Sequence, residues 1–211
     1  MKNKVVILGD GGHAISVADV LLSRNEFELI GVFGLDEKNS AFWEAQGVRW
    51  YHESKLLSVR DLANLALIGI GQILDSQPRV RAFNSAVDAG FKLLTLVSPY
   101  AYVSKNAMLG QGTVAMHGSI INGFARIGDN SIINSRALLE HGVTVGDHSH
   151  ISTGAILNGD SSVGDESFIG SGAILKQGVS IGDKCVVSMG SIVKTNLPEG
   201  QIFRTTGNVE S

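Results

Sequence analysis

Residues 127–163 read IGDNSIINSRALLEHGVTVGDHSHISTGAILNGDSSV, and they show an apolar repeat that runs through the second half of the chain. Every sixth residue from Val97 to Val193 is valine, isoleucine or leucine, apart from Ala115. Two residues before each of these positions lies a residue of a second series, which is nearly all small. A period of six fits neither the 3.6-residue period of an α-helix nor the two-residue period of a strand. It is typical of a parallel β-helix, in which three hexads close one triangular coil.

A longer period marks the corners of that triangle. Aliphatic-glycine pairs recur every 18 residues, and four of the five continue with aspartate; the pairs are Leu109-Gly110, Ile127-Gly128, Val145-Gly146, Val163-Gly164 and Ile181-Gly182. We expect these glycines to adopt backbone angles that other residues avoid, and the aspartates to hydrogen-bond within their turns. The coils should be spaced like neighbouring strands, about 4.8 Å apart. A β-sandwich with accidental spacing is the alternative, and a repeat this regular disfavours it.

The first half of the chain alternates predicted strands and helices. Strands are expected at residues 5–8, 29–33, 65–70 and 91–97, and helices at residues 14–22 and 78–89, with weaker helical signals at residues 41–46 and 54–64. The apolar face of the first helix is expected to carry Ile15, Ala18, Leu21 and Leu22. This alternation predicts a small parallel α/β sheet. We expect two domains, residues 1–97 and residues 98–211.

Composition excludes several partners. The 211 residues carry a formal net charge of −3, so neither a nucleic acid nor an anionic membrane is expected to bind. The single cysteine, Cys185, falls in the small series, where we expect it to be buried and not to act as a nucleophile. The first apolar run, residues 5–9, is too short for a signal peptide or a membrane span. We therefore expect a cytoplasmic protein.

A glycine-rich turn follows the first predicted strand. Gly9-Asp10-Gly11-Gly12-His13 would let a phosphate approach the backbone, and the helix that begins there favours anions. A mononucleotide or nucleotide-sugar is the favoured ligand, with a dinucleotide or a purely structural turn as alternatives. Asp36, after the second strand, could then bind a ribose hydroxyl. His13 is expected either to contact the ligand or to cap the turn.

The coils contain a candidate general base. His141 comes two residues after the inward-facing Leu139, so it lies at a corner, where a neutral imidazole can accept a proton near pH 7. Glu140 is expected to orient His141 or to raise its basicity, while His148 is expected to be a solvated surface residue. An alternative is a zinc site made of His141, His148 and His150. It is disfavoured because the N-terminal α/β unit would have no part in that chemistry.

The motifs Gly9-Asp10-Gly11-Gly12-His13, Ile70-Gly71 and Asn134 with Glu140-His141, together with the hexads, resemble those of a known family. The chain is similar to bacterial sugar acetyltransferases of the sialic acid O-acetyltransferase type, and most similar to the N-acetyltransferases of UDP-4-amino sugars and perosamine-type sugars. The resemblance implies a Rossmann-like nucleotide-sugar-binding domain followed by a left-handed parallel β-helix. It also implies acetyl-CoA as co-substrate, no metal, and a homotrimer with active sites between subunits.

The resemblance assigns roles to individual residues. It implies that His141 is the base that deprotonates the sugar amine or hydroxyl during direct attack on the thioester, and that Asn134 lies beside it. The implied nucleotide-sugar contacts are Gly11, Gly12, His13 and Gly71, with Asp36 and Glu37 at the uracil and ribose. The residues implied to line the acetyl-CoA groove are His150, Ser171 and Met189.

Three departures from the family pattern affect these expectations. The position after the base, where the family often has an acid, is Gly142, so Glu140 would have to substitute. Gly34 looks like an insertion before the acidic pair, and the usual Gly-x-Pro-Ala motif is missing from Thr206-Gly207-Asn208-Val209.

Other parts of the chemistry stay open at this point. A glycine-rich corner near Gly142 or Gly159 is expected to offer backbone N–H groups to the oxyanion. Three alternative functions remain: sialic acid O-acetylation, a non-catalytic trimeric scaffold and a zinc hydratase.

Overall fold

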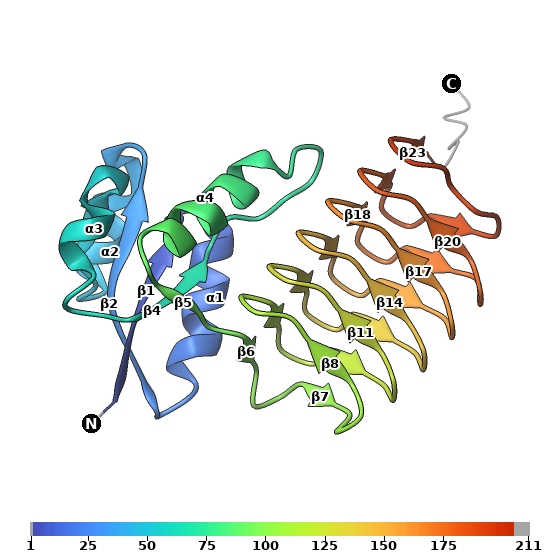
Figure 1. Cartoon of the computed structure of the whole chain (residues 1–211), viewed down its shortest axis with the longest axis horizontal. Helices are drawn as coiled ribbons and strands as arrows, with labels where there is room; N and C mark the ends of the chain where they lie inside the picture. The colour runs from blue at the N-terminus through green and yellow to red at the C-terminus, as the bar shows by residue number, and fades with distance from the viewer. Residues whose placement is uncertain (1, 205–211) are drawn as a thin grey trace.

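The computed structural model describes residues 2–204, in which an α/β unit is followed by a left-handed parallel β-helix (Figure 1). The expected fold class is therefore confirmed. Thr206-Gly207-Asn208-Val209, from which the usual Gly-x-Pro-Ala motif is missing, lies outside the described residues. Within residues 2–204, no helix combines the length and the apolar character that crossing a membrane requires.

The N-terminal unit is a parallel sheet with helices on both faces. Its strands, in the spatial order β3-β2-β1-β4-β5, are β1 (Asn3–Leu8), β2 (Phe27–Gly34), β3 (Trp50–His52), β4 (Leu65–Ile68) and β5 (Lys92–Leu93). Its helices are α1 (Gly12–Leu22), α2 (Ser40–Ala45), α3 (Leu56–Val59) and α4 (Gln77–Asp88), with short 3-10 turns at Glu37–Asn39 and Glu53–Lys55. Val5 and Ile7 of β1 pack with α1 and α2, whereas Val6 and Leu8 pack with α3 and α4. Alternate residues of one strand thus supply two cores.

Several expectations for this unit were wrong in detail. Ile15 and Leu22 are exposed, because α1 buries a stripe that runs through Ala14, Val17 and Leu21 instead. Strand β3 was missed, and the helix expected at residues 54–64 is much shorter. The strand expected at residues 91–97 is two strands: β5 pairs with β4, whereas β6 (Leu96–Val97) pairs with β9 of the β-helix.

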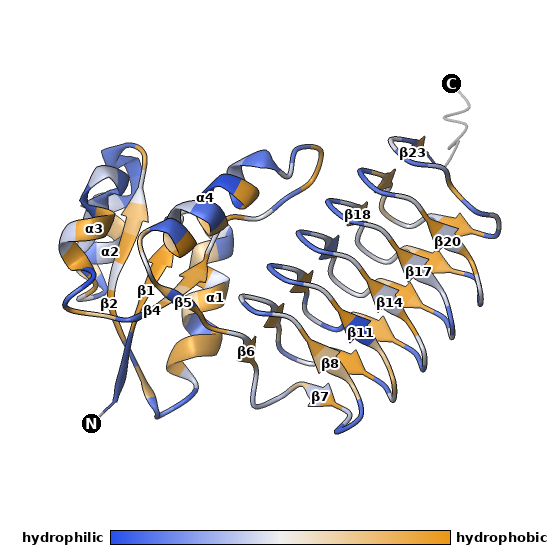
Figure 2. Cartoon of the chain, viewed as in Figure 1, coloured by the Kyte–Doolittle hydropathy of each residue, from blue (hydrophilic) through white to orange (hydrophobic). Residues whose placement is uncertain are grey.

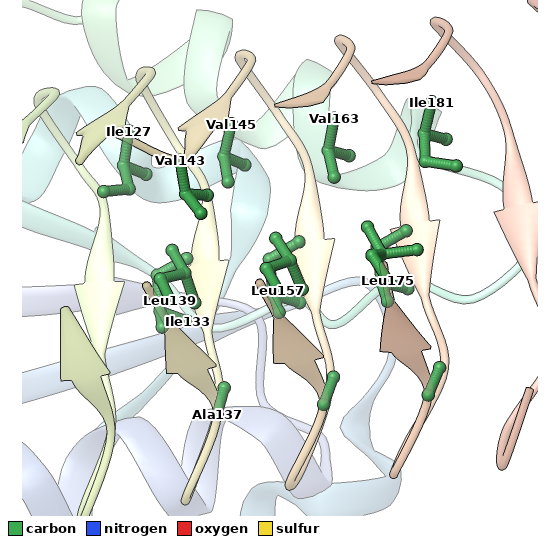
Figure 3. Close-up of a cluster of buried hydrophobic side chains, with 14 of the residues drawn as sticks. Ile127, Ile133, Ala137, Leu139, Val143, Val145, Leu157, Val163, Leu175 and Ile181 are labelled. Atoms are coloured by element: carbon green, nitrogen blue, oxygen red, sulfur yellow. The ribbon is translucent and has the colours of Figure 1, made fainter. Parts of the chain in front are cut away.

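The β-helix consists of two-residue strands joined by corners. In chain order, the strands are β6 (Leu96–Val97), β7 (Tyr102–Val103), β8 (Met108–Leu109), β9 (Val114–Ala115), β10 (Ile120–Ile121), β11 (Arg126–Ile127), β12 (Ile132–Ile133), β13 (Leu138–Leu139), β14 (Thr144–Val145), β15 (His150–Ile151), β16 (Ile156–Leu157), β17 (Ser162–Val163), β18 (Phe168–Ile169), β19 (Ile174–Leu175), β20 (Ser180–Ile181), β21 (Val186–Val187), β22 (Ile192–Val193) and β23 (Ile202–Phe203). They form three parallel sheets: a seven-stranded sheet from β6 to β23, a six-stranded sheet from β7 to β22 and a five-stranded sheet from β8 to β20. The second residue of each strand points into the prism, where the aliphatic side chains stack coil on coil (Figure 3). The corners between the apolar strands are more hydrophilic (Figure 2).

The corner glycines and aspartates act differently from expectation. Gly128 is not in the left-handed region; a Cβ there would lie 2.7 Å from the backbone nitrogen of Asp147 in the next coil, so close approach demands the glycine. The carboxylate of Asp147 does not bond within its own turn but accepts from the Asp129 N–H, 2.7 Å away and one coil earlier. Left-handed residues instead recur every six positions from Gly112 to Gly190.

The α/β unit covers one side of the prism. The outward residues of the seven-stranded sheet, from Leu96 on β6 to Phe168 on β18, are buried. Arg79 of α4 is fully buried and donates to the carbonyl oxygen of Asn130 from both Nε (2.9 Å) and Nη2 (2.7 Å). Further along, Ser76 and Gln77 donate to the carboxylate of Glu166. These contacts fix the unit against the coils.

Candidate functional site

A cavity of about 800 Å³ opens at the carboxyl ends of β1, β2 and β4. Its walls are the glycine-rich turn after β1, the ends of β2 and β4, and the first turns of α4. Ligands of parallel α/β sheets bind at this edge, and the volume lies within the usual range for small-molecule sites. The cavity is therefore large enough for a nucleotide with a sugar attached.

The cavity gathers most of the residues predicted to bind the substrate. Gly11, Gly12, His13, Asp36 and Gly71 line it, whereas Glu37 is not among its lining residues. A Cβ on Gly11 or Gly12 would meet no atom within 4 Å, so both backbones border open space at the start of α1. The N–H groups of such a helix end bind anions.

Side chains behind the glycine-rich turn hold it in place. Asp10 accepts hydrogen bonds from Trp43 Nε1 at its carbonyl oxygen and from Trp50 Nε1 at its carboxylate, both at 2.9 Å. A Cβ on Gly34 would overlap that carboxylate, so the apparent insertion at Gly34 makes room for Asp10. The two tryptophans carry no signal that sequence reasoning could have used.

Charged groups that the sequence did not single out also face the cavity. Arg81 of α4 and Lys38 contribute two cations to its lining. Lys38 forms an ion pair with Asp36 at 3.1 Å, and the hydrogen bonds from Lys38 lower the pKa of Asp36 below its usual value. Both cations could face the phosphates of a nucleotide.

Two buried histidines lie where the unit meets the coils. His150 donates from Nδ1–H to the carbonyl oxygen of Gln72 (2.8 Å) and accepts at Nε2 from the Asn134 amide (3.1 Å). Burial lowers the pKa of His150 to about 4. Burial, Arg79 and His150 together lower the pKa of His13 to about 3. Both imidazoles are neutral at pH 7, and within residues 2–204 the enclosed Nε2 of His13 has no hydrogen-bond partner.

Two of the three residues predicted for the acetyl-CoA groove share one corner of the prism. Ser171 and Met189 lie one coil apart at the corner between the seven- and six-stranded sheets, and Asn134 lies at the same corner two coils earlier. Ser171 hydrogen-bonds to Ser152 at 2.9 Å, and Met189 is 78 % exposed. His150, by contrast, is covered by the loop after β4.

His141 lies at the next corner, between β13 and β14. The Cε1–Nε2 edge of its ring lies against Gly159 of the following coil, where a Cβ would lie 2.5 Å from Cε1 and 2.6 Å from Nε2. Its Nδ1 is 3.8 Å from the Asp160 carboxylate. Glu140 points elsewhere and accepts from the Asn122 amide at 3.1 Å. The acid against His141 is thus Asp160, and Asn134 is at another corner.

The candidate base and the cavity are separate within one chain. His141 is absent from the cavity lining, and its corner joins the two sheets that the α/β unit leaves uncovered. A site that uses both needs a second copy of the chain.

The zinc alternative finds no support in the geometry of the described chain. His148, expected to be solvated, is half-buried beside Phe83 of α4 and bonds to Asn130, whereas His141 is at a different corner. Across residues 2–204, no three His, Cys, Asp or Glu side chains are grouped to hold a metal ion. Cys185 is fully buried, as predicted.

Comparison with family models assigns both parts of the chain. Residues 4–85 match the PglD N-terminal domain. Residues 124–159 match the bacterial transferase hexapeptide (six repeats), and residues 161–194 match the hexapeptide repeat of succinyl-transferase.

Solved structures and a curated relative extend the similarity. PerB, the perosamine N-acetyltransferase of Caulobacter crescentus, solved with CoA and GDP-perosamine, is 32% identical with a TM-score of 0.87, over 95% of this chain and 93% of that one. The acetyltransferase domain of PglB from Neisseria gonorrhoeae FA1090, solved with acetyl coenzyme A, is 27% identical with a TM-score of 0.87, over 96% of both chains. UDP-N-acetylbacillosamine N-acetyltransferase of Bacillus subtilis (strain 168) is 35% identical over 121 residues, and this match spans 55% of the chain but only about half, 52%, of the relative.

Proposed function

The chain belongs to the family of hexapeptide-repeat sugar N-acetyltransferases that includes perosamine N-acetyltransferase, and from this we propose that it transfers an acetyl group from acetyl-CoA to the amino group of a nucleotide-linked amino sugar. The observation that carries the proposal is the cavity at the glycine-rich turn, which is of nucleotide-sugar size and lies in the unit that matches the PglD N-terminal domain. We further propose that the product serves bacterial surface glycan biosynthesis and that the enzyme works in the cytoplasm.

The substrate contacts follow from the lining of the cavity. The diphosphate would meet the N–H groups of Gly11 and Gly12 at the start of α1, with Arg81 nearby as a counter-charge. His13 and Gly71 form the wall behind it, and Asp36 would receive a ribose hydroxyl. We accordingly assign nucleotide-sugar binding to residues 1–97 and acetyl transfer to residues 98–211.

The reaction we propose is direct attack within a ternary complex. The sugar amine forms a C–N bond to the thioester carbonyl carbon, the C–S bond breaks, and CoA leaves as its thiol. His141 takes the proton that the amine loses and passes it to the leaving sulfur. The Gly142 N–H already donates to the Gly123 carbonyl oxygen, so we assign the oxyanion donor to Gly159.

An apolar ladder supports a homotrimer. The outward residues of the six-stranded sheet are apolar in every coil: Tyr102, Ile120, Leu138, Ile156, Ile174 and Ile192. The five-stranded sheet instead displays Met108, Arg126, Thr144, Ser162 and Ser180. An uncovered apolar stripe of this length is typical of an interface between subunits.

Such packing would also complete the active site. His141 lies at the edge of the apolar six-stranded sheet, so a neighbouring copy packed on that sheet can bring its cavity toward this base. Ser171 and Met189, with the buried His150 behind them, would then border the acetyl-CoA groove. We propose one active site at each subunit boundary.

A thiol-release assay tests the proposed reaction. Purified protein and acetyl-CoA are offered nucleotide-linked 4-amino sugars, with free sialic acid as a hydroxyl acceptor. We expect CoA release only with an amino sugar. Release with sialic acid alone would make the enzyme an O-acetyltransferase, and no release with any acceptor would contradict the proposal and favour a scaffold.

A further inference from the structure

A carboxylate from the next coil fills the space beside His141. Asp160 lies 19 positions after His141 in the chain, yet its Oδ1 is 3.8 Å from His141 Nδ1. Gly142, which follows His141, makes this approach possible because a Cβ at that position would overlap the same Oδ1. A side chain on residue 142 and the Asp160 carboxylate would thus occupy the same space, and in this chain the Asp160 carboxylate occupies it.

The backbone of the same corner fixes this arrangement. The Asp160 N–H donates to the His141 carbonyl oxygen at 2.9 Å, which sets the two residues in register. Asp160 has φ 58, in the left-handed region that ends each hexad. Gly159, directly before it, supports the Cε1 and Nε2 edge of the imidazole. Gly159 and Asp160 therefore lie against both ring nitrogens of His141: Gly159 against Nε2, and Asp160 against Nδ1.

We propose that Asp160 is a positioning residue for His141. Its carboxylate accepts a hydrogen bond from Nδ1–H and so selects the tautomer in which Nε2 carries the free lone pair. The proton of the attacking amine moves to Nε2, Nδ1 keeps its own proton, and the carboxylate stabilises the imidazolium that forms. This inference rests on the proposed function, because it assumes that His141 is the base.

The distance of 3.8 Å exceeds a hydrogen bond, and a modest side-chain rotation closes it. In the single chain, the side chains of His141 and Asp160 are 62 % and 63 % exposed, so both are free to turn. Catalytic hydrogen bonds are often long without substrate and shorten when the site is filled. A neighbouring subunit and the two substrates would exclude bulk water from the pair and so strengthen the hydrogen bond.

The fold offers a clean way to remove the carboxylate. The residues equivalent to Asp160 one coil before and one coil after are Gly142 and Gly178, both with positive φ. Asp160→Gly therefore repeats a corner that the protein already builds twice, and it should fold. The double variant Gly142→Asp/Asp160→Gly moves the carboxylate to the position after the base, where the space has been vacated.

Two measurements on the purified full chain test the inference. In Asp160→Gly we expect kcat to fall on the order of 10-fold or more, part of the 10²–10⁴-fold that a general base supplies, with both KM values within about twofold. Ring ¹⁵N chemical shifts of His141 should show the Nδ1–H tautomer in the wild type and a mixture in Asp160→Gly. The double variant should regain most of the lost kcat, and Asp88→Asn, which removes an exposed carboxylate from α4, should match the wild type.

The outcomes separate this inference from the proposed function. If His141→Ala is inactive while Asp160→Gly keeps both the wild-type kcat and the wild-type tautomer, Asp160 has only a structural place at the corner and the inference fails alone. A loss in Asp160→Gly that appears in KM rather than kcat would also overturn it. Full activity in His141→Ala would overturn both proposals.

Discussion

Gly159→Ala should displace the imidazole of His141 while leaving the residue itself in place. The added methyl carbon would lie 2.5 Å from Cε1 and 2.6 Å from Nε2 of His141, whereas ordinary carbon contacts begin at 3.4 Å. The ring must therefore move by about 0.9 Å, the shortfall at Cε1, which is of the size that costs roughly 10²-fold in rate when a reacting group is misplaced. Gly159 does not have a positive φ, so alanine is unstrained at this position.

The assay is CoA thiol release under saturating acetyl-CoA, with the free energy of unfolding measured in parallel. We expect kcat to fall about 10²-fold. Stability should change by less than about 1 kcal/mol, because the displaced imidazole is exposed and can turn away.

Gly123→Ala is the matched control. Gly123 occupies the same corner two coils earlier, and its Cβ would lie 3.8 Å from the Ser104 hydroxyl, so we expect wild-type activity. A Gly159→Ala enzyme with undiminished kcat would refute the placement of the reacting nitrogen over Gly159.

Three further predictions concern stability and assembly. Arg79→Met should lower the free energy of unfolding by about 3–5 kcal/mol in urea titrations, since it leaves buried carbonyl oxygens of both units without a charged donor; a loss below about 1 kcal/mol would contradict this. His150 is neutral when folded, with a pKa near 4, so the unfolded chain binds more protons below its pKa of about 6.5 and stability falls as the pH drops from there towards 4. This group lowers the free energy of unfolding by about 2 kcal/mol at pH 5. The fall in unfolding free energy between pH 7.5 and pH 5 should therefore be smaller by that amount in His150→Gln than in the wild type. Ile156→Glu should convert the proposed trimer to a species of 22.3 kDa in light scattering, whereas Ser162→Glu on the five-stranded sheet should leave the assembly intact.

The hexad period was sufficient to predict the β-helix, because each aliphatic position reports directly on the inside of the prism. The burial of Cys185 followed from the same six-residue period, because Cys185 falls in the series of small residues. Left-handed corners recur every six residues too, but Phe124, Arg136 and Lys184 occupy some of them, so no residue type marks the series. The corner glycines looked like the left-handed residues and were required for close approach instead.

The candidate site was predictable where it depended on local sequence and not where coils or units meet. The glycine-rich turn and Asp36 were found because both follow strands of one sheet. The docking of His150 under Gln72 depends on two segments 78 residues apart that share no pattern. Asp160 carried a usable signal, since adding the 18-residue coil offset to Gly142 leads to it.

Subunit complementation tests the central claim most directly, namely that the base of one chain serves the cavity of its neighbour. His141→Ala removes the base, and Gly11→Leu fills open cavity space with a side chain. Each variant alone should be inactive in the thiol-release assay. Co-assembled in equal amounts, they should recover about a quarter of the wild-type activity. Half of all bases and half of all cavities are intact, and a working site needs one intact base and one intact cavity. Mixed trimers with no recovered activity would contradict a site shared between subunits.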